Sequence, residues 1–144
     1  MIYQEEPKGF VADLEVVGCF VEAKGNILQL LRPDNNKKAE PRKWGCVGGK
    51  IEEGEGPRTA MVREMREETS LNIFPSQLYF CKKFYVEYPA CKFIYHIFKL
   101  KLPFRPEINL SMEHISYVWI PPAYANSLDL MQDEWECIKL VYGL

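Results

Sequence analysis

The stretch 48-GGKIEEGEGPRTAMVREMREETSL-71 combines a glycine pair, a run of glutamates and an Arg- and Glu-rich segment at fixed offsets. Pro57 fits the first turn of a helix, where its missing N–H costs nothing, and no further helix breaker follows in the stretch. We therefore expect one helix that carries residues 63–68. Because each helical residue advances by about 100°, Glu64, Glu67 and Glu68 cluster on one side of it.

Three clustered carboxylates repel one another and require an explanation. Glu64 and Glu68 form an unfavourable i, i+4 pair, which costs roughly a few tenths of a kcal/mol in an exposed helix. Arg63 relieves part of this repulsion, and Mg²⁺ or Mn²⁺, which prefer carboxylate and water oxygens, relieves more. The pair Gly48-Gly49 also lets the backbone approach a bound group closely. The stretch is therefore either a salt-bridged surface helix or a metal site beside a phosphate.

The metal interpretation indicates a class of reaction. Bridging metals neutralise phosphate charge and orient its oxygens, while a carboxylate that is not a ligand can remove a proton from an attacking water. Hydrolysis of a phosphoanhydride bond uses both features.

Over its whole length the stretch resembles the signature of the Nudix hydrolases, G-x5-E-x7-R-E-U-x-E-E-x-G-U, in which U is apolar. Its defining positions are filled in register by Gly49, Glu55, Arg63, Glu64, Met65, Glu67, Glu68 and Leu71. Ser70 stands where the family has glycine. A left-handed residue is often needed at such a helix end, and a non-glycine residue there costs about 1 kcal/mol.

The resemblance implies roles for the residues that match the signature. The implied metal ligands are Gly48 or Gly49, through a carbonyl, with Glu64, Glu67 and Glu68. Members of the family differ in which glutamate serves as the general base, and Glu64 is our candidate if Glu67 and Glu68 are committed to metal. Glu55 and Arg63 are expected to hold loop and helix in register.

A later segment, 111-SMEHISYVWI-120, resembles a region of many Nudix proteins in which an acidic residue before a Trp-bearing strand enters the site. Glu113 is that candidate, as a further ligand or as the base; a solvated loop glutamate is the alternative. His96 and His114 are expected to be structural or surface residues.

Substrate recognition outside the signature is less clearly indicated. Arg32 precedes the polar loop 33–43 and is the first candidate for a substrate phosphate, ahead of Arg42 and Lys43. Alternation along residues 92–102 places Phe93, Tyr95 and Ile97 on one face of a strand, and either face could line the cleft.

The rest of the chain indicates strands and a closing helix. A β-hairpin is expected over 10–22 and 27–32, and further strands over 78–88, 92–102 and 115–120. The tail 129–144 has apolar residues three or four apart with acidic residues between them, which predicts an amphipathic helix. We expect a single domain over residues 1–144 of the α/β (α+β) class. The resemblance implies an α/β/α sandwich with a central mixed β-sheet.

Composition limits the setting and the partners. The 144 residues, 47% of them hydrophobic, suffice for one domain with a proper core. A net charge of −2 gives no broad positive field, so nucleic-acid polymers and membranes are not favoured partners. The start of the chain lacks a secretory pattern, and the five cysteines show no C-x-x-C spacing. A cytoplasmic setting is expected, and a homodimer stays open.

The expected function is that of a Mg²⁺- or Mn²⁺-dependent pyrophosphohydrolase acting on a nucleoside triphosphate or another nucleoside-diphosphate-linked substrate. The alternative is a catalytically silent nucleotide-binding sensor or interaction module. An RNA-decapping hydrolase would need a basic track, which a pI near 5.8 disfavours. Residues 44–55 resemble enzymes that remove oxidised nucleoside triphosphates, whereas 111–120 resemble members acting on dinucleoside polyphosphates.

Overall fold

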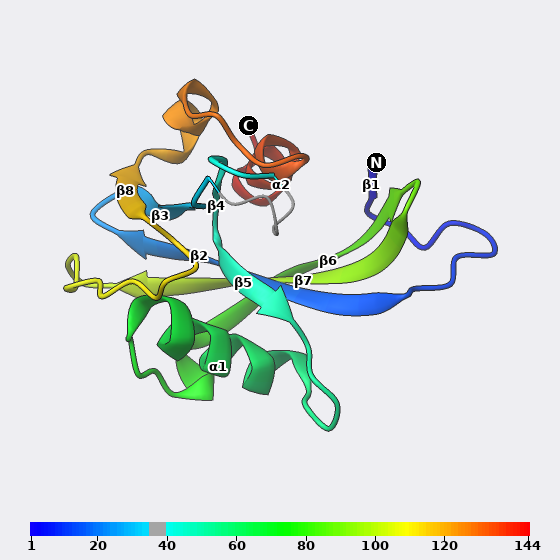
Figure 1. Ribbon diagram of the computed structural model, residues 1–144, viewed down its shortest axis with the longest axis horizontal. Helices are drawn as coiled ribbons and strands as arrows, with labels where there is room; N and C mark the ends of the chain where they lie inside the picture. The colour runs from blue at the N-terminus through cyan, green and yellow to red at the C-terminus, as the bar shows by residue number, and fades with distance from the viewer. Residues whose placement is uncertain (35–39) are drawn as a thin grey trace.

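The computed structural model describes residues 1–34 and 40–144, in which a mixed β-sheet lies between two helices (Figure 1). The described strands are β1 (Ile2–Tyr3), β2 (Leu14–Ala23), β3 (Asn26–Leu31), β4 (Trp44–Gly45), β5 (Val47–Lys50), β6 (Leu78–Tyr88), β7 (Cys91–Leu102) and β8 (Ser116–Ile120). The helices are α1 (Pro57–Thr69), η1 (Pro75–Gln77), η2 (Pro122–Ser127) and α2 (Glu134–Tyr142).

Strand β2 organises the sheet, whose order is β1-β6-β7-β2-β3-β4 with β5 also beside β2 and β8 beside β3. The β2–β7 pairing is parallel and the other strand pairings are antiparallel, so the sheet is mixed as predicted. The predicted hairpin is confirmed: Lys24 and Gly25, with φ of 52° and 79°, turn the chain from β2 into β3. Its first strand begins at Leu14 rather than Phe10, because the Phe10 N–H is engaged in a turn with the Pro7 carbonyl.

Each face of the sheet is covered by one helix, which confirms the predicted α/β/α layering. Helix α1 packs Met61 and Met65 against one face, while α2 packs Ile138 against the other (Figure 1). Strand β2 serves both cores, since Val17 points toward α1 and Phe20 toward α2.

Strand β7 settles which aromatic face meets which helix. Tyr95 and Ile97 lie on the α2 side of the sheet, and Phe98 lies on the α1 side. The alternation pattern grouped Phe93, Tyr95 and Ile97 on one face of this strand. Of these three residues, Phe93 and Tyr95 line a cavity that is described below.

The closing helix is confirmed but is shorter than its apolar pattern. Met131 lies before α2, because Asp133 adopts a left-handed conformation (φ 63°) and the helix starts after it. Glu134, expected among the polar positions of the helix, is only 5% exposed. Within the described residues, no helix has the length and apolar character needed to cross a membrane.

Candidate active site

The ends of α1 fix the predicted carboxylates in place. Gly56, in an extended conformation, precedes Pro57 at the first turn, as the sequence predicts. At the other end Ser70 adopts the left-handed conformation (φ 66°) that the glycine position requires, and its N–H donates to the Arg66 carbonyl. The Ser70 hydroxyl also donates to the Asn109 carbonyl at 3.0 Å. The helix end is thereby tied to the loop that leads to Glu113.

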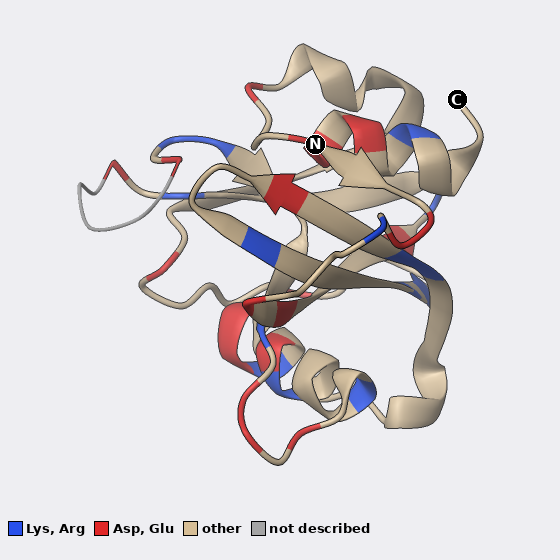
Figure 2. Cartoon of the chain, turned by 90° about the vertical axis from the view of Figure 1, so that its right-hand side faces the viewer, with Lys and Arg blue, Asp and Glu red and all other residues tan. Residues whose placement is uncertain are grey.

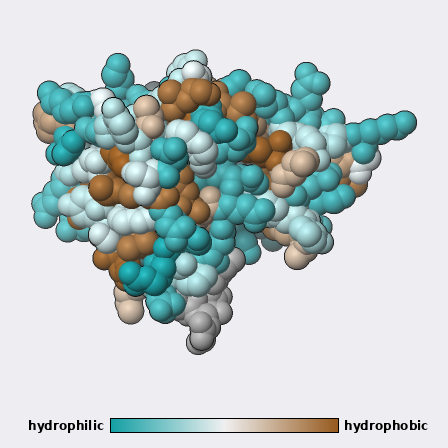
Figure 3. Space-filling model, turned by 90° about the horizontal axis from the view of Figure 1, so that it is seen from above, coloured by the Kyte–Doolittle hydropathy of each residue, from teal (hydrophilic) through white to brown (hydrophobic). Residues whose placement is uncertain are grey.

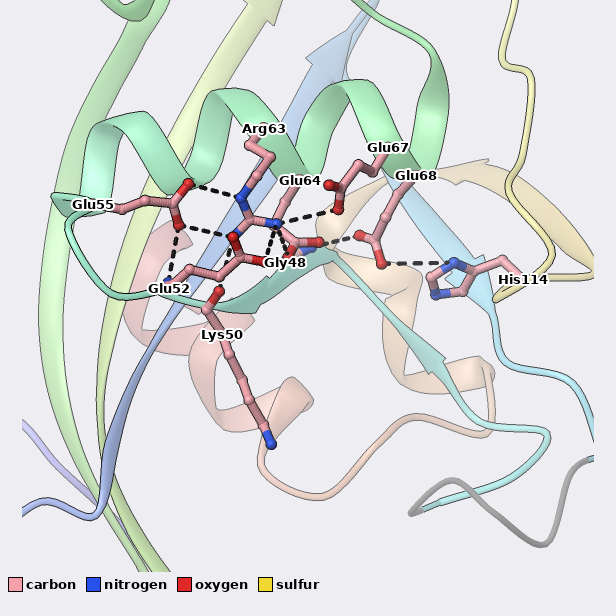
Figure 4. Close-up of polar contacts among 9 residues, drawn as sticks. All are labelled: Gly48, Lys50, Glu52, Glu55, Arg63, Glu64, Glu67, Glu68 and His114. Atoms are coloured by element: carbon pink, nitrogen blue, oxygen red, sulfur yellow. Dashed lines mark hydrogen bonds and ion pairs between the residues drawn. The ribbon is translucent and has the colours of Figure 1, made fainter.

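Arg63 connects the loop before α1 to the carboxylates of the helix (Figure 4). Its Nε and Nη2 donate to the two Glu55 oxygens at 2.7 and 2.9 Å, and Nη2 also donates to the Lys50 carbonyl at 3.0 Å. Its Nη1 donates to Glu64 at 2.8 Å and to Glu67 at 3.1 Å. One guanidinium therefore sets the relative positions of β5, the loop and two candidate ligands.

This pairing also sets the charges of its members. Hydrogen bonds from Arg63 and from the Glu52 N–H lower the pKa of Glu55 to about 2, so Glu55 stays ionised. The Glu55 carboxylate in turn raises the pKa of Arg63. Both groups are already engaged with protein partners, and neither lines the cavity described below.

Glu64 and Glu68 are buried carboxylates, 8% and 4% exposed. Burial raises the pKa of Glu64 despite the bond from Arg63, and burial raises the pKa of Glu68 to about 8 despite a 2.8 Å hydrogen bond from the Gly48 N–H. The charges of Glu64 and Glu113 act in the same direction on Glu68. This part of the molecule concentrates negative charge that a cation would stabilise.

The two glycines allow the close approach of strand and helix. A Cβ on Gly49 would lie 2.4 Å from a Glu64 carboxylate oxygen. A Cβ on Gly48 would lie 2.2 Å from the Val17 carbonyl of β2. Gly48 therefore excludes any side chain, whereas a side chain at Gly49 would displace the Glu64 carboxylate from its position.

A cavity of about 700 Å³ gathers most of the predicted site residues. Those that line it are Arg32, Gly48, Gly49, Glu64, Glu68 and Glu113. Glu67 is the exception among the predicted metal ligands: its side chain is 50% exposed and points to Arg63 rather than into the cavity. In Figure 2 the acidic segments of α1 and of the loop before it lie together below the sheet.

His114, which the sequence suggested was structural or at the surface, also lines the cavity. Its Nδ1 lies 3.8 Å from a Glu68 carboxylate oxygen (Figure 4). The only sequence signal was its place next to Glu113. His96, on the other hand, lies outside the site and contacts Glu15 at 2.7 Å.

The donor set fits a hard divalent cation. In the part of the chain that the structure describes, no three His, Cys, Asp or Glu side chains converge in a ligating arrangement, because Arg63 engages Glu64 and Glu67. The available donors are nevertheless carboxylate and backbone oxygens, which suit Mg²⁺ or Mn²⁺ better than soft metals. Two of these donors, the Glu64 and Glu68 carboxylates, are buried, and the charge of Glu64 helps to raise the pKa of Glu68.

The α2 end of the cavity holds a further buried carboxyl that the sequence did not single out. Glu134 accepts a 3.0 Å hydrogen bond from Gln29 Nε2, and burial raises the pKa of Glu134 to about 7 against that bond. Nearby, Tyr95 Oη lies 3.3 Å from Cys46 Sγ. The cavity therefore has one acidic end at α1 and one largely apolar end at α2.

Known proteins provide independent comparisons. The CTP pyrophosphohydrolase of Escherichia coli (strain K12) is 41% identical over 58 residues, which are 40% of this chain and 42% of that protein. The chain thus spans about two fifths of that curated relative's length. The solution structure of the E. coli ORF135 protein superimposes with a TM-score of 0.74 at 26% identity, covering 96% of this chain and 94% of that one.

The fold also matches the NUDIX domain of Shewanella oneidensis NrtR, solved in complex with ADP ribose, with a TM-score of 0.77. That match covers 96% of this chain and 92% of the other at 17% identity, which shows the shared fold. The family profile described as the NUDIX domain matches residues 13–141 of this chain. Since this range includes every strand from β2 to β8, all of α1 and all but the last residue of α2, the chain belongs to the Nudix family.

Proposed function

We propose that this protein is a Mg²⁺-dependent pyrophosphohydrolase that cleaves a phosphoanhydride bond in a nucleoside triphosphate or another nucleoside-diphosphate-linked substrate. The observation that carries the proposal is the cavity itself: Glu64, Glu68 and Glu113 line it together with Arg32. Acidic groups for a metal and a basic group for phosphate therefore face one space, of a size typical of small-molecule sites.

The residues that would hold Mg²⁺ or Mn²⁺ are Glu64, Glu67 and Glu68, with a carbonyl of the Gly48–Gly49 pair. When bound, the cation supplies neutralisation of phosphate charge and orientation of phosphate oxygens. Glu67 reaches the site only by exchanging its Arg63 contact, which at 3.1 Å is the longest of the hydrogen bonds that this guanidinium donates to carboxylates. The Arg63–Glu55 ion pair holds the loop before α1 and positions the carboxylates that would bind the metal.

Two carboxylates are candidates for the general base. Glu64 is held by Arg63 and buried against Gly49, so its position is well defined. Glu113 lies in the loop before β8 and adds its charge to those around Glu68. In either case the carboxylate takes a proton from water as the water oxygen bonds to phosphorus, and the P–O bond to the departing phosphate or pyrophosphate breaks. Arg32 is suited to bind the phosphate oxygens.

The test is release of phosphate and pyrophosphate from nucleoside triphosphates, nucleotide sugars and dinucleoside polyphosphates, with Mg²⁺ or with chelator. Glu68→Gln should reduce turnover by at least about 100-fold, a loss typical when one stabilising group is removed from a catalytic site. Glu53→Gln is the matched control, because Glu53 is exposed in the loop before α1. Turnover that persists in Glu68→Gln or in chelator would refute the proposal.

A nucleotide-binding sensor is the second candidate. It is favoured by the Arg63 contacts to Glu64 and Glu67, which occupy carboxylate oxygens that a metal would use. The solved NrtR NUDIX domain holds ADP ribose, so a domain with this fold binds such a ligand. Nucleotide binding without turnover across the whole panel would favour this candidate.

A further inference from the structure

His114 is a cavity residue without a role in the proposed reaction. Its side chain is 9% exposed and lines the cavity beside Glu68, with Nδ1 3.8 Å from Glu68 Oε2 (Figure 4). Figure 3 shows the α2 side of the molecule, where apolar and polar surface alternate over short distances. His114 is instead enclosed next to α1, in the part of the cavity that gathers the carboxylates.

The backbone around His114 forms a turn that is attached to the sheet. The His114 N–H donates to the Ser111 carbonyl at 3.3 Å, and the Glu113 N–H donates to Ser111 Oγ at 3.3 Å. The next residue, Ile115, donates its N–H to the Leu31 carbonyl of β3 at 2.9 Å. The imidazole therefore projects into the cavity from a backbone whose position is set by β3.

Glu68 lies between this turn and strand β5. Its Oε1 accepts the Gly48 N–H at 2.8 Å, and its Oε2 faces the His114 ring. At 3.8 Å the contact between Nδ1 and Oε2 is electrostatic, because a hydrogen bond needs a distance of about 3.2 Å or less. Polar groups that contact a metal ligand from outside the coordination sphere orient that ligand. The strand and the turn therefore constrain the Glu68 carboxylate from two sides.

From this geometry we propose that His114 is a positioning residue, whose Nδ1–H orients the Glu68 carboxylate for a divalent cation. The inference rests on the proposed function for the presence of the metal. It requires the imidazole tautomer that carries its proton on Nδ1. The same turn brings Glu113 close to α1, where its charge raises the pKa of both Glu64 and Glu68. His114 thus connects the loop before β8 to the carboxylates of the helix.

The experiment measures the dissociation constant of Mn²⁺ by electron paramagnetic resonance of the free ion, without substrate. It compares His114→Asn with His114→Leu. These two side chains have nearly the same shape and both lack the ring, but only Asn carries an N–H in the place of Nδ1–H. We expect His114→Leu to weaken Mn²⁺ binding by about 10- to 100-fold, and His114→Asn by less than about threefold.

Two further measurements show whether the effect belongs to Glu68. In the Glu68→Gln background, the Asn and Leu variants of His114 should bind Mn²⁺ with equal affinity, because the oriented carboxylate is absent. His96→Leu is the matched control. His96 also contacts a carboxylate, that of Glu15 at 2.7 Å, and it lies outside the cavity, so this variant should keep the wild-type affinity.

The outcomes separate this inference from the proposed function. Equal Mn²⁺ affinities of His114→Asn and His114→Leu overturn the inference, and the proposed function stands if the wild type binds the ion and hydrolyses a nucleotide. A wild type that does not bind Mn²⁺ overturns both. If the Asn and Leu variants differ as expected but no nucleotide is hydrolysed, His114 orients Glu68 in a binding protein, and the hydrolase proposal fails instead. Should His114→Leu not fold, His114→Gln, whose amide lies one bond further from the backbone, replaces it in the comparison.

Discussion

Ser70 offers a sharp test of how this chain departs from its family pattern. It occupies the left-handed C-cap of α1 without being glycine, and its hydroxyl donates to the Asn109 carbonyl. Two effects oppose each other here. The left-handed conformation costs a non-glycine residue about 1 kcal/mol, and a hydrogen bond of this kind contributes about 1 kcal/mol.

Two substitutions separate these effects. Ser70→Gly removes both the strain and the hydrogen bond, so its stability should remain close to that of the wild type. Ser70→Ala keeps the strain and loses the bond, so it should be destabilised by about 1 kcal/mol. With 144 residues and about 2.1 cal/mol/K per residue of unfolding entropy, this difference corresponds to about 3 °C in Tm.

The assay is thermal unfolding followed by circular dichroism, with urea unfolding as a second measure. Both variants lose the hydrogen bond to the Asn109 carbonyl. If this bond positions the loop that carries Glu113, turnover should therefore change by the same factor in Ser70→Gly and in Ser70→Ala. A Ser70→Ala protein as stable as Ser70→Gly, or more stable, would refute the assignment of strain and bond to this residue.

Three further predictions concern the site. Gly49→Ala should lower turnover by at least about 10-fold, because its Cβ would lie 2.4 Å from Glu64; unchanged kcat/KM would contradict this. Arg63→Lys should lower both Tm and turnover, since one ammonium cannot reproduce the paired bonds to Glu55; equal values to wild type would argue against that role. The rise in Tm caused by Mg²⁺ should grow as pH increases from about 4.5 to 8. The pKa of Glu68 is raised to about 8 in the folded protein, so protonation of Glu68 stabilises the metal-free fold and this stability is lost as pH rises. The cation binds the ionised carboxylate, so its own stabilising effect increases over the same pH range. Scanning fluorimetry from pH 5 to 9 checks this, and Glu68→Gln should flatten the dependence.

Local sequence was sufficient for the α1 part of the site. Pro57 and Ser70 mark the helix ends, and the spacing of Glu64 and Glu68 sets their common side, so both were predicted without knowledge of the fold. Glu67 shares that spacing, yet it lies outside the cavity. Helical spacing alone does not show where β5 lies relative to α1. The position of β5 decides which of the three glutamates face the cavity.

The α2 end of the site could not be predicted in this way. Glu134 has acidic neighbours in the chain, and an amphipathic pattern assigns it to the polar face. Its burial depends on Gln29, 105 residues away, and on the left-handed turn at Asp133 that shifts the helix start. His114 was likewise assigned elsewhere, because its contact with Glu68 arises only when β8 pairs with β3.

The parallel pairing of β2 with β7 has a consequence for how the molecule forms. Leu14 pairs with Phe93 and Ala23 with Leu102, so the central ladder joins segments about 80 residues apart. Closing such long loops is slow, because their entropy is lost before the contacts form. On a ribosome, α1 and its carboxylates emerge well before β7, while β2 still lacks its longest partner. We expect the acidic cluster to spend this interval without its cavity, which is also lined by residues after β7 such as Glu113 and Glu134, so the cavity forms only after α2 is synthesised.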